Sequence, residues 1–104
     1  MIKTIEGLDT LKELRQLNLN ENILYRVTGL KECDVLDTLY LKGNRFGRNE
    51  EGDVDALKGL LERPTLTCID IQDNDLSDPA IIEEIFLKMP KLAVLYCSKG
   101  NKFT

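Results

Sequence analysis

The stretch LDTLYLKGN, from Leu36 to Asn44, has the pattern L-x-x-L-x-L-x-x-N. The same spacing occurs at Leu14–Asn22 (LRQLNLNEN) and, with isoleucines at the two inner positions, at Leu66–Asn74 (LTCIDIQDN). A fourth copy, Leu92–Asn101 (LAVLYCSKGN), has one more residue before its asparagine. Side chains alternate across a strand, so the two inner apolar residues of each copy share one side. The recurrence predicts short strands that stack and bury this side together.

This spacing is typical of leucine-rich repeats. The resemblance implies an α/β fold: a leucine-rich-repeat solenoid with a short parallel sheet on its concave face and 3-10 turns or short helices on its convex face. Each copy ends in an asparagine, and an asparagine side chain readily bonds the backbone of a turn. We therefore expect structural rather than ligand-binding roles for these residues, which are Asn22, Asn44, Asn74 and Asn101.

The copies divide a single domain, residues 1–104, into units of unequal length. A partial repeat at 1–13 precedes repeats at 14–35, 36–65 and 66–91, and an imperfect terminal repeat occupies 92–104. The first complete repeat has a short return, for which we expect 3-10-like structure. Neither terminal layer has a covering unit. We therefore expect the chain to belong to a longer solenoid and to make end-to-end contacts between copies.

The two longer repeats are expected to contain helices, capped by Asp53 and by Asp78. The predicted apolar stripes are Val54, Leu57, Leu60 and Leu61 in the first helix, and Ile81, Ile82, Ile85, Phe86 and Met89 in the second. The added residue of the fourth copy predicts either a bulge in its strand or a shift of its pairing by one residue.

Composition excludes several classes of function. Charged residues make up 31% of the chain and its net charge is −4, which disfavours direct binding of nucleic acid or of an anionic membrane. The sequence has no apolar run long enough for a membrane span and no secretory signal in its first ten residues. It has no histidine, and its three cysteines lack metal-site spacing. We predict a cytoplasmic protein with reduced thiols, without metal, cofactor or enzymatic activity.

Further motifs narrow the resemblance. The 22-residue units and the sequence IEGL at Ile5–Leu8 resemble the intracellular subclass typified by the nuclear regulator of protein phosphatase 1. NDLSDP at Asn74–Pro79, MPKL at Met89–Leu92 and the long second repeat resemble the family of dynein axonemal assembly factor 1. This resemblance implies a cytoplasmic protein-binding scaffold, associated with the cilium or flagellum, that helps to preassemble axonemal dynein arms. Its implied partners are dynein-arm subunits or assembly chaperones. The wider subclass leaves two alternatives: a regulatory subunit of a protein phosphatase, or a splicing-type scaffold that binds an RNA-binding protein.

A partner is expected on the side of the sheet opposite the leucines. The predicted binding residues there are Gln16, Asn18, Thr38, Tyr40, Lys42, Asp70, Gln72 and Tyr96. Tyrosine combines apolar area with a hydroxyl at low entropy cost, so Tyr40 and Tyr96 are the expected anchors. Asp70 lies between them by register and suits a lysine or arginine of the partner. We interpret Asp70 and the nearby Asp73 as a hydrated acidic patch rather than a cation site or an acid–base pair. The alternative is a solvated surface without a partner.

Overall fold

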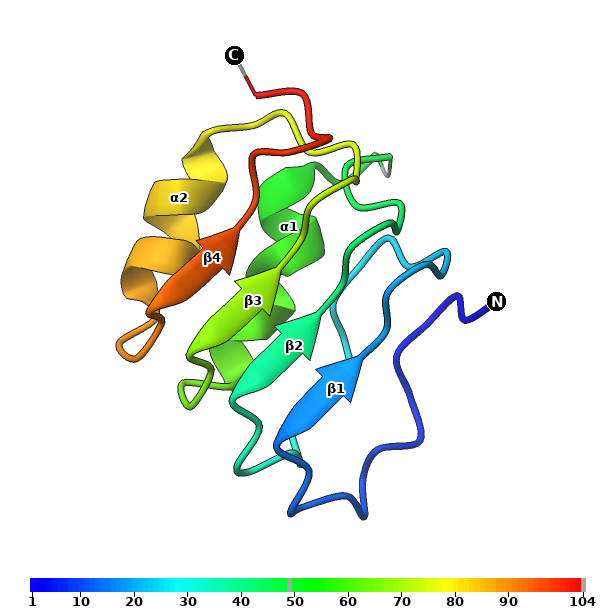
Figure 1. Ribbon diagram of the computed structural model, residues 1–104, viewed down its shortest axis with the longest axis vertical. Coiled ribbons are helices and arrows are strands. Elements are labelled where there is room, and N and C mark those ends of the chain that lie inside the picture. Colours follow the sequence, from blue (N-terminus) through cyan, green and yellow to red (C-terminus); the bar gives the residue numbers. More distant parts are fainter. Residues whose placement is uncertain (49, 104) are drawn as a thin grey trace.

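Short parallel strands form the centre of the molecule. A computed structural model describes residues 1–48 and 50–103, which contain four strands: β1 (Gln16–Asn18), β2 (Thr38–Tyr40), β3 (Cys68–Asp70) and β4 (Val94–Tyr96). They form one parallel sheet in the order β1-β2-β3-β4 (Figure 1). The helices α1 (Asp53–Leu57) and α2 (Ala80–Glu84) are followed by the 3-10 helices η1 (Lys58–Glu62) and η2 (Phe86–Lys88). The predicted α/β class with a parallel sheet is confirmed.

The register of the sheet aligns the inner apolar residues. Leu39 pairs with Leu17 on one side and with Ile69 on the other, and Ile69 pairs with Leu95. Leu39 and Ile69 are fully buried, whereas Leu17 and Leu95 belong to the edge strands and are half-buried. Full burial of such a side chain stabilises a fold by roughly 1.5–3 kcal/mol. The predicted burial of the inner apolar residues is confirmed for Leu39 and Ile69.

The asparagines join successive turns of the chain. The Asn44 side chain is buried, and its Nδ2 donates to the carbonyl oxygens of Leu19 and Leu41, both at 3.0 Å. Its Oδ1 accepts from the backbone N–H of Leu24 at 3.0 Å. The side chain therefore bonds to its own turn and to the preceding one. The other three asparagines, Asn22, Asn74 and Asn101, make corresponding bonds, and the predicted structural role is confirmed.

The added residue of the fourth copy lies in the turn after β4. Strand β4 keeps the register of the other strands. Beyond it, the N–H of Asp73 donates to the carbonyl oxygen of Lys99, whereas the N–H of Gly43 donates to that of Gln72, which directly follows the inner Ile71. The added residue is therefore Ser98. The predicted shift of pairing is wrong, because β4 keeps its register. The predicted bulge is confirmed just after β4, because the acceptors Tyr96 and Lys99 are three residues apart, whereas the corresponding acceptors Asp70 and Gln72 are two apart.

The helices lie behind the strands in Figure 1, on the side of the buried leucines. Their predicted stripes are too wide, because Leu61 is 38% exposed and Ile82 is 37% exposed. Leu61 lies in the 3-10 helix η1, where residues three apart share a face. Leu57 and Leu60 therefore point inward together, and Leu61 turns outward. In α2, the buried face is narrow and contains Ile81, with Ile85 following the helix, so Ile82 projects away.

Asp53 joins two turns of the chain instead of capping its own helix. The N-cap of α1 is Gly52, and no side-chain hydrogen bond caps this helix. Asp53 is buried, and its Oδ2 accepts from the N–H groups of Ser77 and Asp78, both at 2.8 Å. The capping prediction is wrong because the helix begins at Asp53 itself, whose carboxylate reaches the following turn. Asp78 does act at the start of α2, since its Oδ1 accepts from the N–H of Ala80 at 2.9 Å.

Candidate functional site

The side of the sheet opposite the leucines, here called the open face, carries the first and third residues of each strand. The register arranges them in two rows, Gln16, Thr38, Cys68 and Val94 in the first row and Asn18, Tyr40, Asp70 and Tyr96 in the second. With the helices behind the strands, the open face faces the viewer in Figure 1. Every predicted binding residue within a strand therefore lies on one continuous surface.

The second row places a carboxylate between two tyrosines. Neighbouring strands are roughly 4.8 Å apart, so Tyr40 and Tyr96 project from backbones about 10 Å apart, with Asp70 between them. Tyr96 is 51% exposed, and Tyr40 is half-buried. The structure thus brings these three predicted residues together. Their binding of a partner stays a prediction.

Local hydrogen bonds orient the Asp70 carboxylate. Its Oδ1 accepts from the N–H of Gln72 at 3.0 Å and from the Gln72 Nε2 at 3.1 Å. Asn18 makes the same kind of turn, with its Oδ1 accepting from the N–H of Asn20 at 3.0 Å. Among residues 1–48 and 50–103, no donor bonds the Oδ2 of Asp70. Asp70 is consequently both held in place and open to a donor from outside.

Thr38 and Lys42 are less available than the sequence predicts. Thr38 is only 8% exposed, and its hydroxyl donates to the Asp37 carboxylate at 2.7 Å. Thr38 is therefore the least accessible of the predicted binding residues, because a short side chain on an inner strand is shielded by its surroundings and turns toward Asp37. The Lys42 Nζ lies 3.9 Å from the Asp73 Oδ2, which reduces the negative charge of the predicted acidic patch.

The thiols of Cys33 and Cys68 are poorly suited to act as nucleophiles. All three cysteines are free thiols. Burial raises the pKa of Cys33. Burial also raises the pKa of Cys68, with a smaller contribution from the negative charges of Asp70 and Asp37. A thiol with a raised pKa stays protonated at neutral pH and is a poor nucleophile. Within 1–48 and 50–103, no cluster of acidic, histidine or cysteine side chains could hold a metal ion, and no helix combines the length and apolar character needed to cross a membrane.

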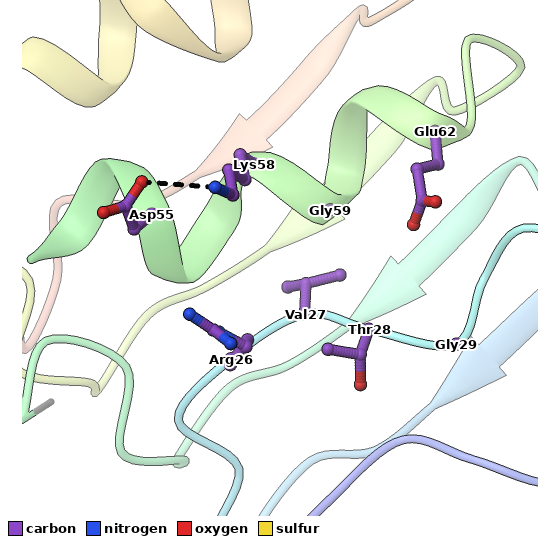
Figure 2. Close-up of a pocket in the computed structure, with 8 residues that line it drawn as sticks. All are labelled: Arg26, Val27, Thr28, Gly29, Asp55, Lys58, Gly59 and Glu62. Atoms are coloured by element: carbon purple, nitrogen blue, oxygen red, sulfur yellow. Dashed lines mark ion pairs between the residues drawn. The ribbon is translucent and has the colours of Figure 1, made fainter. Parts of the chain in front are cut away.

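One cleft lies on the helix side of the sheet (Figure 2). It has a volume of about 550 Å³ and lies between residues 26–29 and the α1–η1 segment. Figure 2 shows Lys58 directed at Asp55, and these side chains form an ion pair at 3.5 Å. Arg26 pairs with Glu51. Gly59 packs so closely on Val27 that an added Cβ would overlap the Val27 carbonyl oxygen. The two segments that border the cleft are therefore closely packed at Gly59, and most of the charged side chains that line it are paired within the chain.

A second cleft, here called the basic cleft, was not predicted from the sequence. It measures about 350 Å³ and is lined by Lys3, Ile23, Tyr25, Arg45, Arg48 and Glu50. These residues come from three consecutive turns of the chain and share no sequence motif. Only the spacing of the repeats, which places residues 3 and 25 at corresponding positions, would have indicated that they converge. A third, smaller cleft of about 190 Å³ is mainly apolar and lies beside Ile82 and Phe103.

The chain was also compared with known proteins. Neither the protein-family models nor the curated proteins include a match to this sequence.

Proposed function

We propose that this chain is a non-enzymatic protein-binding scaffold of the leucine-rich-repeat type, with the open face of its sheet as the binding surface. The observation that carries the proposal is the alignment of Tyr40, Asp70 and Tyr96 on this face. Tyrosines are enriched among the residues that dominate binding energy at interfaces. The buried residues Leu39 and Ile69 anchor the strands from the other side of the sheet. Binding on such a supported surface costs less conformational entropy than binding on a flexible one.

The column of asparagines supports the repeat assignment. It is accompanied by equivalent backbone bonds, in which the N–H of Ile23 donates to the carbonyl oxygen of Ile2 at 3.0 Å and that of Arg45 donates to Leu24 at 2.7 Å. The N–H of Asp75 bonds Phe46 in the same way at 2.7 Å. Units that bond mainly to their neighbours are the defining feature of a solenoid.

The chemistry of the second row favours a partner with an exposed arginine or lysine. The Asp70 Oδ2 accepts no described hydrogen bond and offers a site for a cationic donor. The tyrosine rings on either side offer π faces, and a cation over such a face gains about 0.5–2 kcal/mol. An arginine is favoured over a lysine, because its planar group both stacks on rings and forms two parallel hydrogen bonds with a carboxylate.

The resemblance at Asn74–Pro79 and Met89–Leu92 supports a role in the cytoplasmic preassembly of axonemal dynein arms. Dynein-arm subunits or assembly chaperones would then be the partners, in cells that build cilia or flagella. Recovery of a catalytic phosphatase subunit would favour the regulatory-subunit alternative instead. Recovery of an RNA-binding protein through direct protein contact would favour the splicing-type scaffold.

Affinity capture from flagellated cells tests this function. The tagged chain should retain dynein-arm subunits or their assembly chaperones, identified and quantified by mass spectrometry. Tyr40→Ala and Tyr96→Ala should each lower this recovery at least about fivefold, which corresponds to roughly 1 kcal/mol or more at an anchor. Leu87→Ala is the matched control, because Leu87 is 73% exposed but lies in η2 on the helix side. Loss of capture by the control together with full capture by both tyrosine variants would refute the open-face proposal.

A further inference from the structure

The basic cleft is built on a rigid edge of the molecule. Backbone hydrogen bonds join the turns that line it, from the N–H of Ile23 to Ile2 at 3.0 Å and from the N–H of Arg45 to Leu24 at 2.7 Å. Lys3 follows Ile2, and Tyr25 follows Leu24, so these bonds also fix the separation of their backbones. The side chains of the cleft therefore start from fixed positions and lose little backbone freedom when a ligand binds.

Within the described part of the chain, two of the three cations in the basic cleft form no ion pair. Arg48 bonds the carboxylate of Asp75, which also lies 3.3 Å from the Lys102 Nζ. Lys3 and Arg45 form no ion pair with any residue in 1–48 or 50–103. One carboxylate, that of Glu50, also lines the cleft. The lining therefore keeps a positive balance in a chain whose net charge is −4.

The remaining lining is apolar or aromatic. Ile23 is half-buried between the charged side chains, and Tyr25 is 37% exposed. A bare inorganic ion would leave these two side chains unused. A ligand that matches the whole lining combines an anionic group with apolar neighbours, as a modified side chain within a peptide does.

We propose that the basic cleft binds a phosphorylated side chain of a protein partner, with Arg45 and Lys3 as the phosphate-binding residues. A phosphate monoester carries about −1.5 to −2 charges at pH 7, and the cations Arg45 and Lys3 attract it more strongly than Glu50 repels it. Its oxygens suit the fork of a guanidinium, and an ammonium adds a point charge. At about 350 Å³, the cleft is near the lower limit for ligand sites and accommodates one side chain.

This site is separate from the open face and has the opposite chemistry, so it does not depend on the function proposed above. A nucleic-acid ligand is disfavoured, because a polyanion meets the field of the whole acidic chain. A single phosphate interacts chiefly with the charges nearest to it, since screening limits exposed charges to about 8–10 Å at physiological salt.

The test is a titration of the purified chain with the blocked pentapeptide Gly-Leu-phosphoserine-Leu-Gly, followed by calorimetry and by backbone amide NMR. The phosphopeptide should bind and shift the amides of residues 23–25 and 45–48. The serine version should not bind measurably. A glutamate version should bind at least about tenfold more weakly, because it carries less charge and fewer acceptors. Inorganic phosphate should also bind more weakly than the phosphopeptide, because it leaves Ile23 and Tyr25 without contacts.

Substitutions of the cations and of the carboxylate in the basic cleft should change phosphopeptide affinity in opposite directions. Arg45→Gln and Lys3→Gln should each weaken phosphopeptide binding roughly tenfold or more, as expected for loss of a charged hydrogen bond. Glu50→Gln should strengthen it, because a repulsive carboxylate is removed. Arg15→Gln is the matched control: Arg15 is exposed, lies just before β1, outside the cleft, and forms no ion pair in the described chain. Thermal unfolding of each variant checks that it is folded.

Several outcomes would overturn the proposal. Equal binding of the glutamate and phosphoserine peptides would remove the reason for a phosphate. Equal weakening of phosphopeptide binding by Arg15→Gln and Arg45→Gln would show that binding depends on the net charge of the chain rather than on the basic cleft. Tighter binding of a single-stranded RNA oligonucleotide, sensitive to the same two substitutions, would assign the cleft to nucleic acid instead.

Discussion

Asn44→Ala is the substitution that most directly tests how the turns of this chain are joined. Asn44 is 5% exposed, and its side chain bonds three backbone groups closely: the carbonyl oxygens of Leu19 and Leu41, and the N–H of Leu24. Alanine removes all three bonds and leaves the backbone in place. The cost depends on which of these backbone groups then lacks any hydrogen-bond partner.

The two carbonyl oxygens keep a bond in the variant. Leu19 O also accepts from the Asn22 side chain at 3.0 Å, and Leu41 O also accepts from that of Asn74 at 3.1 Å. The N–H of Leu24 has no second described acceptor, and Leu24 is fully buried. One orphaned buried N–H costs about 1–3 kcal/mol, and the weakened carbonyl bonds add to this. We therefore expect Asn44→Ala to lower the free energy of unfolding by about 2–4 kcal/mol, a large part of the 5–15 kcal/mol typical of a domain.

The assay is urea unfolding, followed by tyrosine fluorescence, since the chain has three tyrosines and no tryptophan, and by circular dichroism. Asn22→Ala is the matched control. Its Oδ1 accepts from the N–H of Ile2 at the exposed edge, where water replaces the lost acceptor, so we expect a cost below about 1 kcal/mol. Equal costs for the two variants, or an Asn44→Ala loss below about 0.5 kcal/mol, would show that burial of the asparagine does not control its contribution.

Three further predictions concern the core, a buried carboxylate and an ion pair. Leu39→Ala should lower the free energy of unfolding by about 2–5 kcal/mol through lost burial and a cavity, and an unchanged urea midpoint would contradict the register of the sheet. Asp53→Ala should cost about 2–4 kcal/mol, because it leaves two backbone N–H groups without their acceptor, whereas Asp53→Asn should cost less; thermal unfolding of both variants checks the order. The hydrogen bond from Arg48 lowers the pKa of Asp75 below its ordinary value of 3.8, and this more than offsets the effect of burial. Because this pKa is lowered in the folded chain, the ionised Asp75 stabilises the fold above pH 3.8. This stabilisation is lost as the pH falls through the folded-state pKa. Acid unfolding of Arg48→Gln should therefore show a smaller loss of stability below pH 4, and an identical acid profile would contradict this ion pair.

Much of the fold follows from the periodicity of the sequence. The spacing of Leu36, Leu39, Leu41 and Asn44 predicts a strand, its buried side and the turn that closes it, because side-chain direction in a strand depends only on residue parity. The same parity places Tyr40 on the open face. Each of these predictions rests on neighbouring residues, and each agrees with the structure in position.

What the sequence could not predict depends on contacts between turns. Asp53 has the residue type and position of a helix cap, but the N–H groups that donate to its carboxylate lie 24 and 25 residues away. Leu61 fits a helical stripe until the segment tightens into a 3-10 helix, and close packing of the adjoining Gly59 on Val27 accompanies that change. The pairing of Arg48 with Asp75, 27 residues along the chain, likewise depends on a contact between turns.

The same parity that builds the core makes the proposed sites independent of it. On the open face, a side chain such as that of Tyr96 points away from the core, because it alternates with core residues along the strand. Tyr96 can therefore be substituted without opening a cavity in the core. In the basic cleft, Arg45 is held by its backbone N–H rather than by its side chain. Binding and folding should therefore respond to different substitutions in this chain. A tyrosine or arginine variant would lose affinity at nearly constant stability, whereas an asparagine variant would lose both, because its side chain holds together the turns on which the two surfaces lie.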